Sequence, residues 1–390
     1  MSDEPLRVAL DLSCAFEGSP TGVGYVALHQ ARALMRLNET LDLRFFATRA
    51  RGIRFSEDLR AGASRTTVFP NGRRLKQALW SRVNWPPIEW FCGGVDAAHG
   101  LFHLLPATAR ARRIVTIYDL VVFRHPETHT ASTVRTHKRL LTHAARHADA
   151  LITISESCRQ DVLDVLNAPP GKVHLVPLGV SPEEFAGALD EDILAQRKDN
   201  LDLAGAYWIC IGTIEPRKNL CRLLEAYRRI VDRFPECPDL LLVGRRGWLA
   251  EPVFQTIAQL RLAQRVKYAG YLKRSDVILL LRGSAACLYP SLYEGFGLPV
   301  LEAMAAQVPV LTSKAASMPE VIGPHGIIVE PQDVDALEWG LEQLLTQPAA
   351  CQQMAARAFE RACSFSWENS ARRLVDVYRA VCGRHVTERA

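Results

Sequence analysis

The sequence lacks any long apolar run. The best apolar stretches of the 390-residue chain are residues 240–243 and 277–281. Both fall far short of the about 20 apolar residues that a membrane-spanning helix requires. The N-terminus, MSDEPLRVALDL, carries acidic residues and enters a predicted strand at once, unlike a signal peptide. We therefore expect a soluble, cytoplasmic protein.

Cysteine is present but unclustered. The ten cysteines form no C-x-x-C motif and no Cys/His group, which favours reduced structural thiols over disulfides or a zinc site. Low-complexity tracts and short repeats are also missing. An apolar fraction of 48% with 23% charged residues is typical of a globular chain. The length suits two domains.

Positive charge is unevenly placed along the chain. The net charge is +5, but residues 49–82 hold nine Lys and Arg against two acids, and residues 105–146 hold eight against two. Either these segments are solvated faces, or they contact an anionic membrane leaflet or a phosphate-bearing acceptor. The basic residues are not interleaved with stacking aromatics, which argues against nucleic acid.

Short β-rich runs alternate with longer helical patterns, which is typical of βα units and parallel sheets. The predicted strands are residues 6–11, 41–47, 66–69, 96–99, 113–117, 150–154 and 173–176, then 207–211, 240–243, 266–269, 286–289, 310–312 and 327–329. The helical patterns between them include residues 24–37, 219–234, 299–306 and 333–345. We therefore predict an α/β fold with two doubly wound, Rossmann-like domains.

The junction between the two domains is expected within residues 177–205, where Pro182 breaks the chain before a polar stretch. Residues 366–380 carry the apolar stripe of an amphipathic helix, formed by Trp367, Leu374, Val375 and Tyr378. In open α/β sheets, ligands bind outside the carboxyl ends of the strands. Two such domains therefore predict an active site in the cleft between them.

A glycine-containing loop joins a predicted strand to a helix in residues 289–306, YPSLYEGFGLPVLEAMAA. Its glycines let the backbone approach a ligand, and Pro299 fits the first helical position. The N-terminus of such a helix attracts anions. Phosphate bound there would repel Glu294 before the loop and Glu302 one turn into the helix. We therefore predict that these two carboxylates hold hydroxyl groups of a sugar and of a ribose.

A second strand-to-helix turn lies in residues 211–220, IGTIEPRKNL. Pro216 marks the turn, and Arg217 and Lys218 are placed to pair with phosphate oxygens. Taken singly, either block also fits an ordinary helix start with a capping loop. Because both follow strands of the same predicted domain, together they favour a diphosphate site.

These blocks resemble a known family. Glu294-x7-Glu302 within EGFGLPVLEAMA is similar to the hallmark of glycosyltransferase family 4, whose members have the two-domain GT-B fold. IGTIEPRKNL, SMPEVIG at residues 317–323, FSWENSARRLVDVYR at residues 365–379 and TGVGYVALHQARAL near the start match the family in order and spacing. TIEPRKN, YDLVVFRHPE and HADALITIS look closest to the mannosyltransferase-like branch of bacterial surface-polysaccharide assembly.

The resemblance implies an acceptor-binding domain at residues 1–180, a nucleotide-sugar-binding domain at 181–365, and a C-terminal helix in 366–390 that packs back on the first domain. It implies that Arg217 and Lys218 stabilise the leaving diphosphate, that Glu294 contacts the transferred sugar, and that Glu302 contacts the ribose. The other implied donor contacts are Phe296, Gly297, Leu298, Gly244 and Tyr271. No metal or other cofactor is expected, and the anomeric configuration would be retained by a front-face route.

Two further motifs have competing interpretations. Residues 22–27 satisfy the dinucleotide pattern G-x-G-x-x-A, but ten residues separate them from the preceding strand, whereas that fingerprint directly follows a strand. We instead predict that Gly22 and Gly24 form a glycine loop near the donor diphosphate or the acceptor. Asp333-Val-Asp335 matches a D-x-D metal motif, but it opens a helical pattern, where Asp is an ordinary cap.

Tyr118 and Asp119 follow the predicted strand at residues 113–117. Members of the resembling family often carry His-Asp here, so Tyr118 departs from the pattern and no histidine contact is expected at this position. Asp119 is predicted to orient donor or acceptor. Tyr118, His99 and His103 are predicted acceptor contacts, with a structural role as the alternative for each histidine.

The expected reaction is transfer of a hexose, with mannose from GDP-mannose as the best guess, to a hydroxyl of a glycan or lipid-linked acceptor. The alternatives are a UDP-sugar-dependent transferase, a nucleotide-sugar epimerase or phosphorylase on the same fold, and a non-catalytic sugar-nucleotide-binding partner. Peripheral membrane contact through the basic N-terminal segments is a further expectation.

Overall fold

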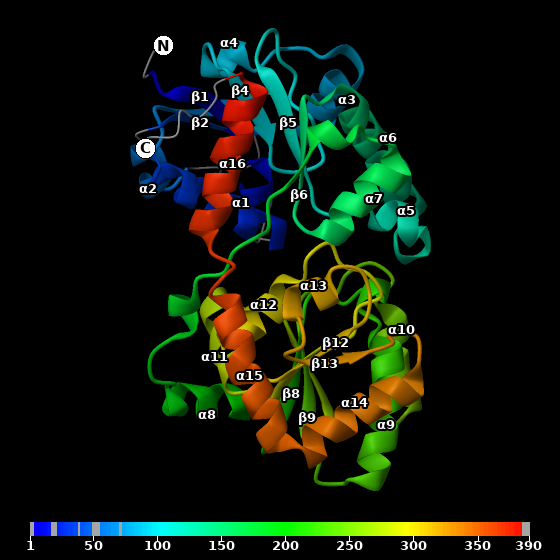
Figure 1. The fold of residues 1–390 in the computed structure, drawn as a ribbon. Helices are drawn as coiled ribbons and strands as arrows, with labels where there is room; N and C mark the ends of the chain where they lie inside the picture. The colour runs from blue at the N-terminus through cyan, green and yellow to red at the C-terminus, as the bar shows by residue number, and fades with distance from the viewer. Residues whose placement is uncertain (1–3, 17–21, 38–39, 49–54, 70–71, 384–390) are drawn as a thin grey trace. The chain divides into compact units, whose positions relative to one another are not determined.

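The computed structural model describes residues 4–16, 22–37, 40–48, 55–69 and 72–383. The chain divides into two compact units. The first unit is drawn from Met1–Phe123, Ser132–Gly179 and Ser366–Ala390, and the second from Arg124–Ala131 and Val180–Phe365 (Figure 1). Within the described residues, no helix is long and apolar enough to cross a membrane.

The first unit contains a seven-stranded parallel sheet in the order β3-β2-β1-β4-β5-β6-β7. Its strands are β1 (Leu6–Asp11), β2 (Leu41–Thr48), β3 (Arg65–Phe69), β4 (Ala97–Gly100), β5 (Arg112–Ile117), β6 (Ala150–Thr153) and β7 (Val173–Leu175). The helices of this part of the chain are α1 (Gly22–Met35), α2 (Glu57–Ala61), α3 (Arg73–Val83), α4 (Glu89–Cys92), α5 (Val121–Arg124), α6 (Ala131–His147) and α7 (Glu156–Leu166). The strand order reverses between β1 and β4, which makes this a doubly wound sheet.

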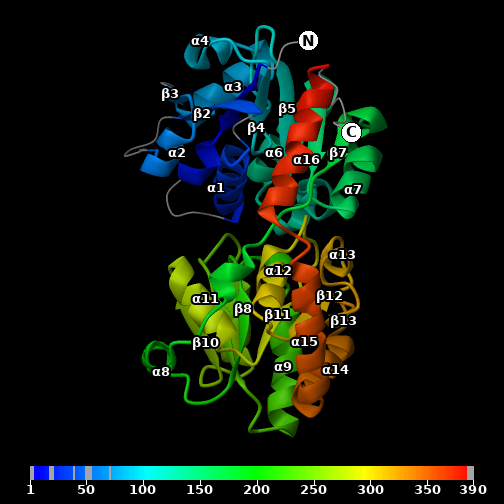
Figure 2. The ribbon, with the colours of Figure 1, turned by 60° about the vertical axis from the view of Figure 1, so that its left-hand side comes forward.

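The C-terminal helix α16 (Trp367–Val381) belongs to the first unit and packs along α1 (Figures 1 and 2). The ring of Trp367 lies 5.2 Å from that of His29 and 6.2 Å from that of Tyr25. Further along α16, Leu374 and Tyr378 are fully buried, and the Tyr378 ring lies 5.6 Å from that of His99 in β4. The amphipathic stripe of α16 therefore completes the core of a unit whose other elements lie almost 200 residues earlier, since that part of the chain ends at Gly179.

The second unit contains a six-stranded parallel sheet in the order β10-β9-β8-β11-β12-β13. Its strands are β8 (Tyr207–Ile211), β9 (Asp239–Val243), β10 (Val266–Gly270), β11 (Ala286–Tyr289), β12 (Val310–Ser313) and β13 (Ile327–Val329). Its helices are α8 (Glu191–Asp199), α9 (Leu220–Arg233), α10 (Glu251–Gln259), α11 (Arg274–Arg282), α12 (Leu298–Ala305), α13 (Met318–Ile322), α14 (Val334–Thr346) and α15 (Pro348–Ala362). The order reverses between β8 and β11, so these two neighbouring strands flank the switch point at which ligands bind in such sheets.

Helical periodicity explains why these segments cover the sheet. In α9, the buried Leu220, Leu223, Leu224, Tyr227 and Ile230 recur at helical spacing and pack into the apolar core under β8 and β9. Each of the strands predicted from the sequence is present in the described structure, with bounds that differ by at most one residue. The α/β, doubly wound fold class is therefore confirmed.

Two of the points at which the chain passes from one unit to the other, after Gly179 and after Phe365, are adjacent. The backbone N–H of Val180 donates to the carbonyl of Phe365 at 2.8 Å. Gly179 precedes the first passage, and a Cβ atom there would lie only 2.3 Å from the backbone nitrogen of Trp367. Only glycine therefore allows these two segments of the backbone to lie so close together.

Candidate active site

Glu294 lies in the loop after β11, where its buried carboxylate is held between two cations. Arg217 donates from Nη1 to Glu294 Oε2 at 2.6 Å, and Lys218 donates from Nζ to Oε1 at 2.6 Å. Burial alone would raise the pKa of this carboxyl, but the two cations outweigh it and hold the pKa at about 2. Glu294 is therefore a carboxylate, not an acid, at neutral pH.

The turn after β8 places both cations. The 3-10 helix Pro216–Lys218 ends at Asn219, which adopts a left-handed conformation (φ 59°) and begins α9. The Asn219 amide donates to the carbonyls of Pro290 at 3.2 Å and Pro331 at 2.5 Å. This amide fastens the turn to the loop that carries Glu294, so the two predicted blocks form one site.

Glu215 is a partner of this site that the sequence did not reveal. It is buried, and its Oε1 accepts from Arg217 Nε at 3.0 Å and from Nη2 at 2.7 Å. Arg217 also donates to the carbonyl of Tyr293 at 3.2 Å. Two carboxylates, Glu215 and Glu294, therefore face two cations, Arg217 and Lys218.

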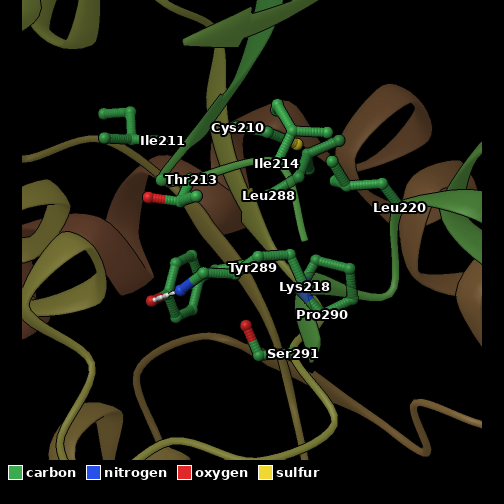
Figure 3. Close-up of a pocket in the computed structure, with 11 residues that line it drawn as sticks. Cys210, Ile211, Thr213, Ile214, Lys218, Leu220, Leu288, Tyr289, Pro290 and Ser291 are labelled. Atoms are coloured by element: carbon green, nitrogen blue, oxygen red, sulfur yellow. Dashed lines mark hydrogen bonds between the residues drawn. The ribbon is translucent and has the colours of Figure 1, made fainter. Parts of the chain in front are cut away.

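Tyr289, the last residue of β11, lies against Lys218. Lys218 Nζ donates to the Tyr289 hydroxyl at 2.5 Å and lies 4.4 Å from the ring centre (Figure 3). Burial lowers the pKa of Lys218, although the Glu294 charge opposes that shift. A pocket beside this pair is lined by the ends of β8 and β11 and includes Gly212 and Ser291. It lies at the switch point of the second unit.

The helix that follows this loop begins as predicted. Gly297 precedes α12 with φ 98°, and a Cβ atom there would lie 2.2 Å from the side chain of Met318. Pro299 lies in the first turn, and Phe296 is buried against Phe365 with ring centres 5.8 Å apart. The backbone of Phe296, Gly297 and Leu298 therefore leads directly into a helix N-terminus beside Glu294.

Glu302 belongs to a different ion-paired group of the second unit. Its buried carboxylate accepts from Arg274 Nη1 at 2.5 Å, and Arg274 Nη2 also donates to Glu184 at 3.2 Å. Burial raises the pKa of Glu302, and the Arg274 charge partly offsets that shift. Sequence reasoning missed Arg274, because it comes from α11 and no motif marks it.

The predicted base-contacting residues also come together. Gly244, directly after β9, donates its N–H to the carbonyl of Gly270 at 2.8 Å, beside Tyr271. A Cβ atom at Gly244 would lie 1.9 Å from the Gly212 carbonyl oxygen, so glycine is required there. Tyr271 is exposed, and the Arg245 guanidinium lies 4.8 Å from its ring centre. Three strand ends therefore meet around an accessible aromatic face.

In the first unit, the structure corrects the prediction for His99. Its ring is fully buried, with Nδ1 2.7 Å from the Tyr378 hydroxyl and Nε2 2.9 Å from the Thr116 hydroxyl. Burial lowers the pKa of His99 to about 3. Because both nitrogens are used internally, the predicted acceptor contact of His99 is wrong, and the residue instead ties α16 to the sheet.

The loop conformation predicted for residues 22–27 is also wrong, whereas their predicted position near the donor diphosphate or the acceptor stays a prediction. Gly22 and Gly24 lie in the first turn of α1. A Cβ atom at Gly24 would lie 2.7 Å from the Cys14 carbonyl oxygen, so this glycine lets α1 pack closely on the segment after β1. A Cβ atom at Gly22 would meet no atom within 4 Å.

The other predicted residues of the first unit follow β4 and β5. Asp119 accepts from the Val121 N–H at 3.1 Å and so caps α5. Tyr118 is buried, burial raises its pKa, and its hydroxyl has no hydrogen-bond partner within the described structure. His103 is buried against the rings of Phe102 and His137, at 4.2 and 5.2 Å. In the second unit, Asp333 caps α14 as predicted, through the N–H groups of Asp335 and Ala336.

Two Rossmann-like units and a buried cation–carboxylate group at a switch point define the class of GT-B enzymes. Residues 193–361 match the family described as glycosyl transferases group 1, and residues 20–184 match glycosyltransferase family 4. The O-antigen chain mannosyltransferase B of Escherichia coli is 32% identical over 281 residues, which cover 72% of this chain and 73% of that protein. The chain belongs to glycosyltransferase family 4 and is a glycosyltransferase.

A second relative is also a mannosyltransferase by name, and two solved structures share the fold. The MMP alpha-(1->4)-mannosyltransferase of Mycolicibacterium hassiacum is 32% identical over 248 residues, covering 62% of this chain and 56% of that protein. Sucrose-phosphate synthase from Thermosynechococcus elongatus superimposes with a TM-score of 0.77 at 19% identity, over 97% of this chain and 100% of that one. WaaG, a glycosyltransferase involved in lipopolysaccharide biosynthesis, gives a TM-score of 0.73 at 16% identity, over 95% and 99%. The last two show that the fold is shared.

Proposed function

We propose that this enzyme is a retaining mannosyltransferase. It transfers mannose from GDP-mannose to a hydroxyl of a glycan or lipid-linked acceptor in surface-polysaccharide synthesis. The main observation in support of this proposal is the buried Glu294 carboxylate, which lies between Arg217 and Lys218. The names of the O-antigen chain mannosyltransferase and of the MMP mannosyltransferase support the choice of sugar.

The two cations perform the electrostatic work of the reaction. As the bond between sugar and diphosphate breaks, negative charge grows on the leaving phosphate, and preorganised donors at that position lower the barrier. The charges of Arg217 and Lys218 are matched by Glu215 and Glu294. Their ionic partners keep both cations aligned before the donor arrives, which is the preorganisation that this kind of catalysis requires.

Glu294 binds the sugar by accepting hydrogen bonds and does not transfer a proton. With a pKa of about 2, it carries no proton to donate near neutral pH, whereas its oxygens accept hydrogen bonds from sugar hydroxyls. The acceptor hydroxyl then attacks on the face from which the diphosphate departs, and the diphosphate takes up the hydroxyl proton. This route retains the anomeric configuration without a covalent intermediate on Glu294.

The nucleotide lies along the strand ends of the second unit. Glu302 accepts hydrogen bonds from the ribose hydroxyls, and the exposed ring of Tyr271 stacks on the base beside Gly244. Phe296, Gly297 and Leu298 hold phosphate and sugar through their backbone. The first unit binds the acceptor, where His103 follows β4 at the switch point of its sheet and Tyr118 and Asp119 follow the neighbouring strand β5.

A UDP-sugar is the second candidate donor, because HepE of Anabaena, solved in complex with UDP-glucose, has the same fold with a TM-score of 0.73 at 17% identity. Thermal unfolding with GDP-mannose, UDP-glucose and UDP-N-acetylglucosamine separates the two candidates. A ligand at 100 times its Kd stabilises the fold by about 2.7 kcal/mol. Stabilisation by UDP-sugars alone would refute the choice of GDP-mannose and leave the transferase assignment intact.

A further inference from the structure

Residues 124–131 belong to the second unit, although the chain on either side of them belongs to the first. The first unit stops at Phe123 and resumes at Ser132, with Arg124–Ala131 in the second unit. We call these eight residues the inserted segment. It runs from the end of α5 to the start of α6 and contains the 3-10 helix Pro126–Thr128. The second unit is therefore completed by a piece of chain from between two parts of the first.

Hydrogen bonds within the inserted segment fix its shape. The N–H and the hydroxyl of Thr128 both donate to the His125 carbonyl, at 3.1 and 2.7 Å. The Glu127 carboxylate lies 3.1 Å from His125 Nδ1, and His129 Nδ1 lies 2.9 Å from the Thr128 hydroxyl. Thr128 is only 2% exposed, unlike a residue of a linker that merely crosses the surface. The rings of His125 and His129 are therefore held by a compact turn.

One contact of the inserted segment is with the loop after β9. Trp248 Nε1 donates to the Thr128 carbonyl at 2.6 Å, and the rings of Trp248 and His129 lie 4.9 Å apart. The residue before Trp248 is Gly247, whose N–H donates to the Ile214 carbonyl at 3.0 Å. Ile214 lines the pocket in Figure 3 and leads directly into the turn that carries both cations. The inserted segment is therefore linked to that turn through Trp248.

The other contact of the inserted segment is with the loop after β11. The His125 ring packs on the ring of Tyr293, with centres 5.7 Å apart. Tyr293 is buried and directly precedes Glu294, and its carbonyl accepts from Arg217 Nη1 at 3.2 Å. In the same loop, the Leu292 N–H donates to the Arg217 carbonyl at 2.8 Å. His125 therefore supports the loop at the point where it is bonded to Arg217.

These two contacts join the loops on either side of the cations. In the six-stranded sheet, β8 lies between β9 and β11. The turn after β8 carries Arg217 and Lys218, and the loop after β11 carries Glu294. By contacting the loops after β9 and β11, the inserted segment restrains both neighbours of that turn. Catalytic groups need such restraint, because a misplacement of about 1 Å can lower a rate by on the order of 100-fold.

We propose that the inserted segment is a positioning element of the glycosyltransferase reaction, which keeps the Glu294 carboxylate and the two cations in their relative positions. His125 and Trp248 are its positioning residues, because they act through the loops after β11 and β9. The catalytic consequence rests on the proposed function of the cation–carboxylate group. The order that the segment imposes on the two loops can be measured without any substrate.

Hydrogen exchange of the substrate-free protein tests the contact with the loop after β11. The reporter is the Leu292 N–H, which is bonded to the Arg217 carbonyl. His125→Ala should speed its exchange by roughly tenfold or more, because the loop opens more easily without the ring that supports it. His125→Phe keeps a ring against Tyr293 and should preserve slow exchange. Unchanged exchange within β8 and β11 shows that the His125→Ala protein is folded.

Trp248→Phe tests the contact with the loop after β9. It removes the N–H that bonds the Thr128 carbonyl, so the Gly247 N–H should exchange faster than in wild type. The matched control is Trp339→Phe, which removes an exposed indole N–H on α14 and should leave exchange in both loops unchanged. Wild-type exchange of Leu292 in His125→Ala, and of Gly247 in Trp248→Phe, would overturn the proposal whatever the donor is.

Steady-state release of GDP from GDP-mannose, with water as the acceptor, separates positioning from a loss of donor binding. His125→Ala should lower kcat by roughly tenfold and change the donor KM by less than about threefold, and His125→Phe should restore most of kcat. Wild-type kcat in His125→Ala, or a loss that His125→Phe does not restore, would contradict a positioning role. Wild-type protein that releases no GDP would instead refute the choice of donor, which the exchange experiment does not use.

Discussion

His99 makes the stability of the first unit depend on pH. Its ring is fully buried between Tyr378 of α16 and Thr116 of β5, and its pKa is lowered from 6.5 to about 3. The folded protein therefore leaves this ring neutral under conditions in which the unfolded chain binds a proton. Because the unfolded state gains the proton first, the free energy of unfolding falls as pH decreases from about 6.5 towards 3.

The size of the effect follows from the two pKa values. Each pKa unit corresponds to about 1.4 kcal/mol, so between pH 8 and pH 5 this single histidine removes about 2 kcal/mol from the free energy of unfolding. Other histidines also contribute, since burial lowers the pKa of His143 to about 4. The contribution of His99 must therefore be isolated by substitution.

Urea unfolding of wild type and His99→Gln at pH 8 and pH 5 measures that contribution. The variant is less stable at pH 8, because the ring is replaced in a tight core. Its further loss on going to pH 5 should be smaller than that of wild type by about 2 kcal/mol. Tyr378→Phe is the companion, since it removes one partner of the ring and should cost about 1–3 kcal/mol even at pH 8. An equal acid-induced loss in wild type and His99→Gln would refute the reasoning.

Three further predictions concern the second unit. Glu215→Gln should lower kcat by roughly tenfold and leave donor KM less affected, because Arg217 loses its alignment; steady-state kinetics decide, and an unchanged kcat would contradict it. Arg274→Met should cost about 1–3 kcal/mol in urea unfolding, since the buried Glu302 loses its cation, while adding Glu302→Gln should restore part of the loss; strictly additive effects would exclude the coupling. Glu294 has a lowered pKa, so its stabilising effect is present above about pH 4.5 and is lost as pH falls towards 2. Glu294→Gln should therefore lower turnover without altering the shape of the pH–rate profile between pH 5 and pH 8, and loss of an acidic limb would contradict this.

The strands could be predicted closely from the sequence, because each is a short apolar run between turn residues and helical patterns. The meeting of Glu294 with Arg217 and Lys218 could also be expected, since both blocks follow strands of one parallel sheet. The partners of Glu302 and His99 could not. Arg274 lies 28 residues before Glu302, and Tyr378 lies 279 residues after His99. Both contacts therefore depend on how the helices pack against the sheet.

The error at Gly22 and Gly24 has a local cause. Glycine costs up to about 1 kcal/mol in a helix interior, so two glycines favour a loop when propensity alone is considered. In the structure, packing overrides that preference, because Gly24 must lie against the backbone of Cys14. The role of Glu215 could not be predicted either. The sequence EPRK does not show which of the two cations the carboxylate contacts, because that depends on the geometry of the turn.

The position of α16 has a consequence for biosynthesis. The ribosome releases the chain from its N-terminus, so every element of the second unit has emerged once Phe365 has left the exit tunnel. The first unit, although its sheet is made earlier, still lacks the helix that carries Trp367 and Tyr378. During translation, the later half of the polypeptide can thus reach its final structure before the earlier half. A nascent chain that stalls before α16 would expose the apolar surface around His99 to chaperones.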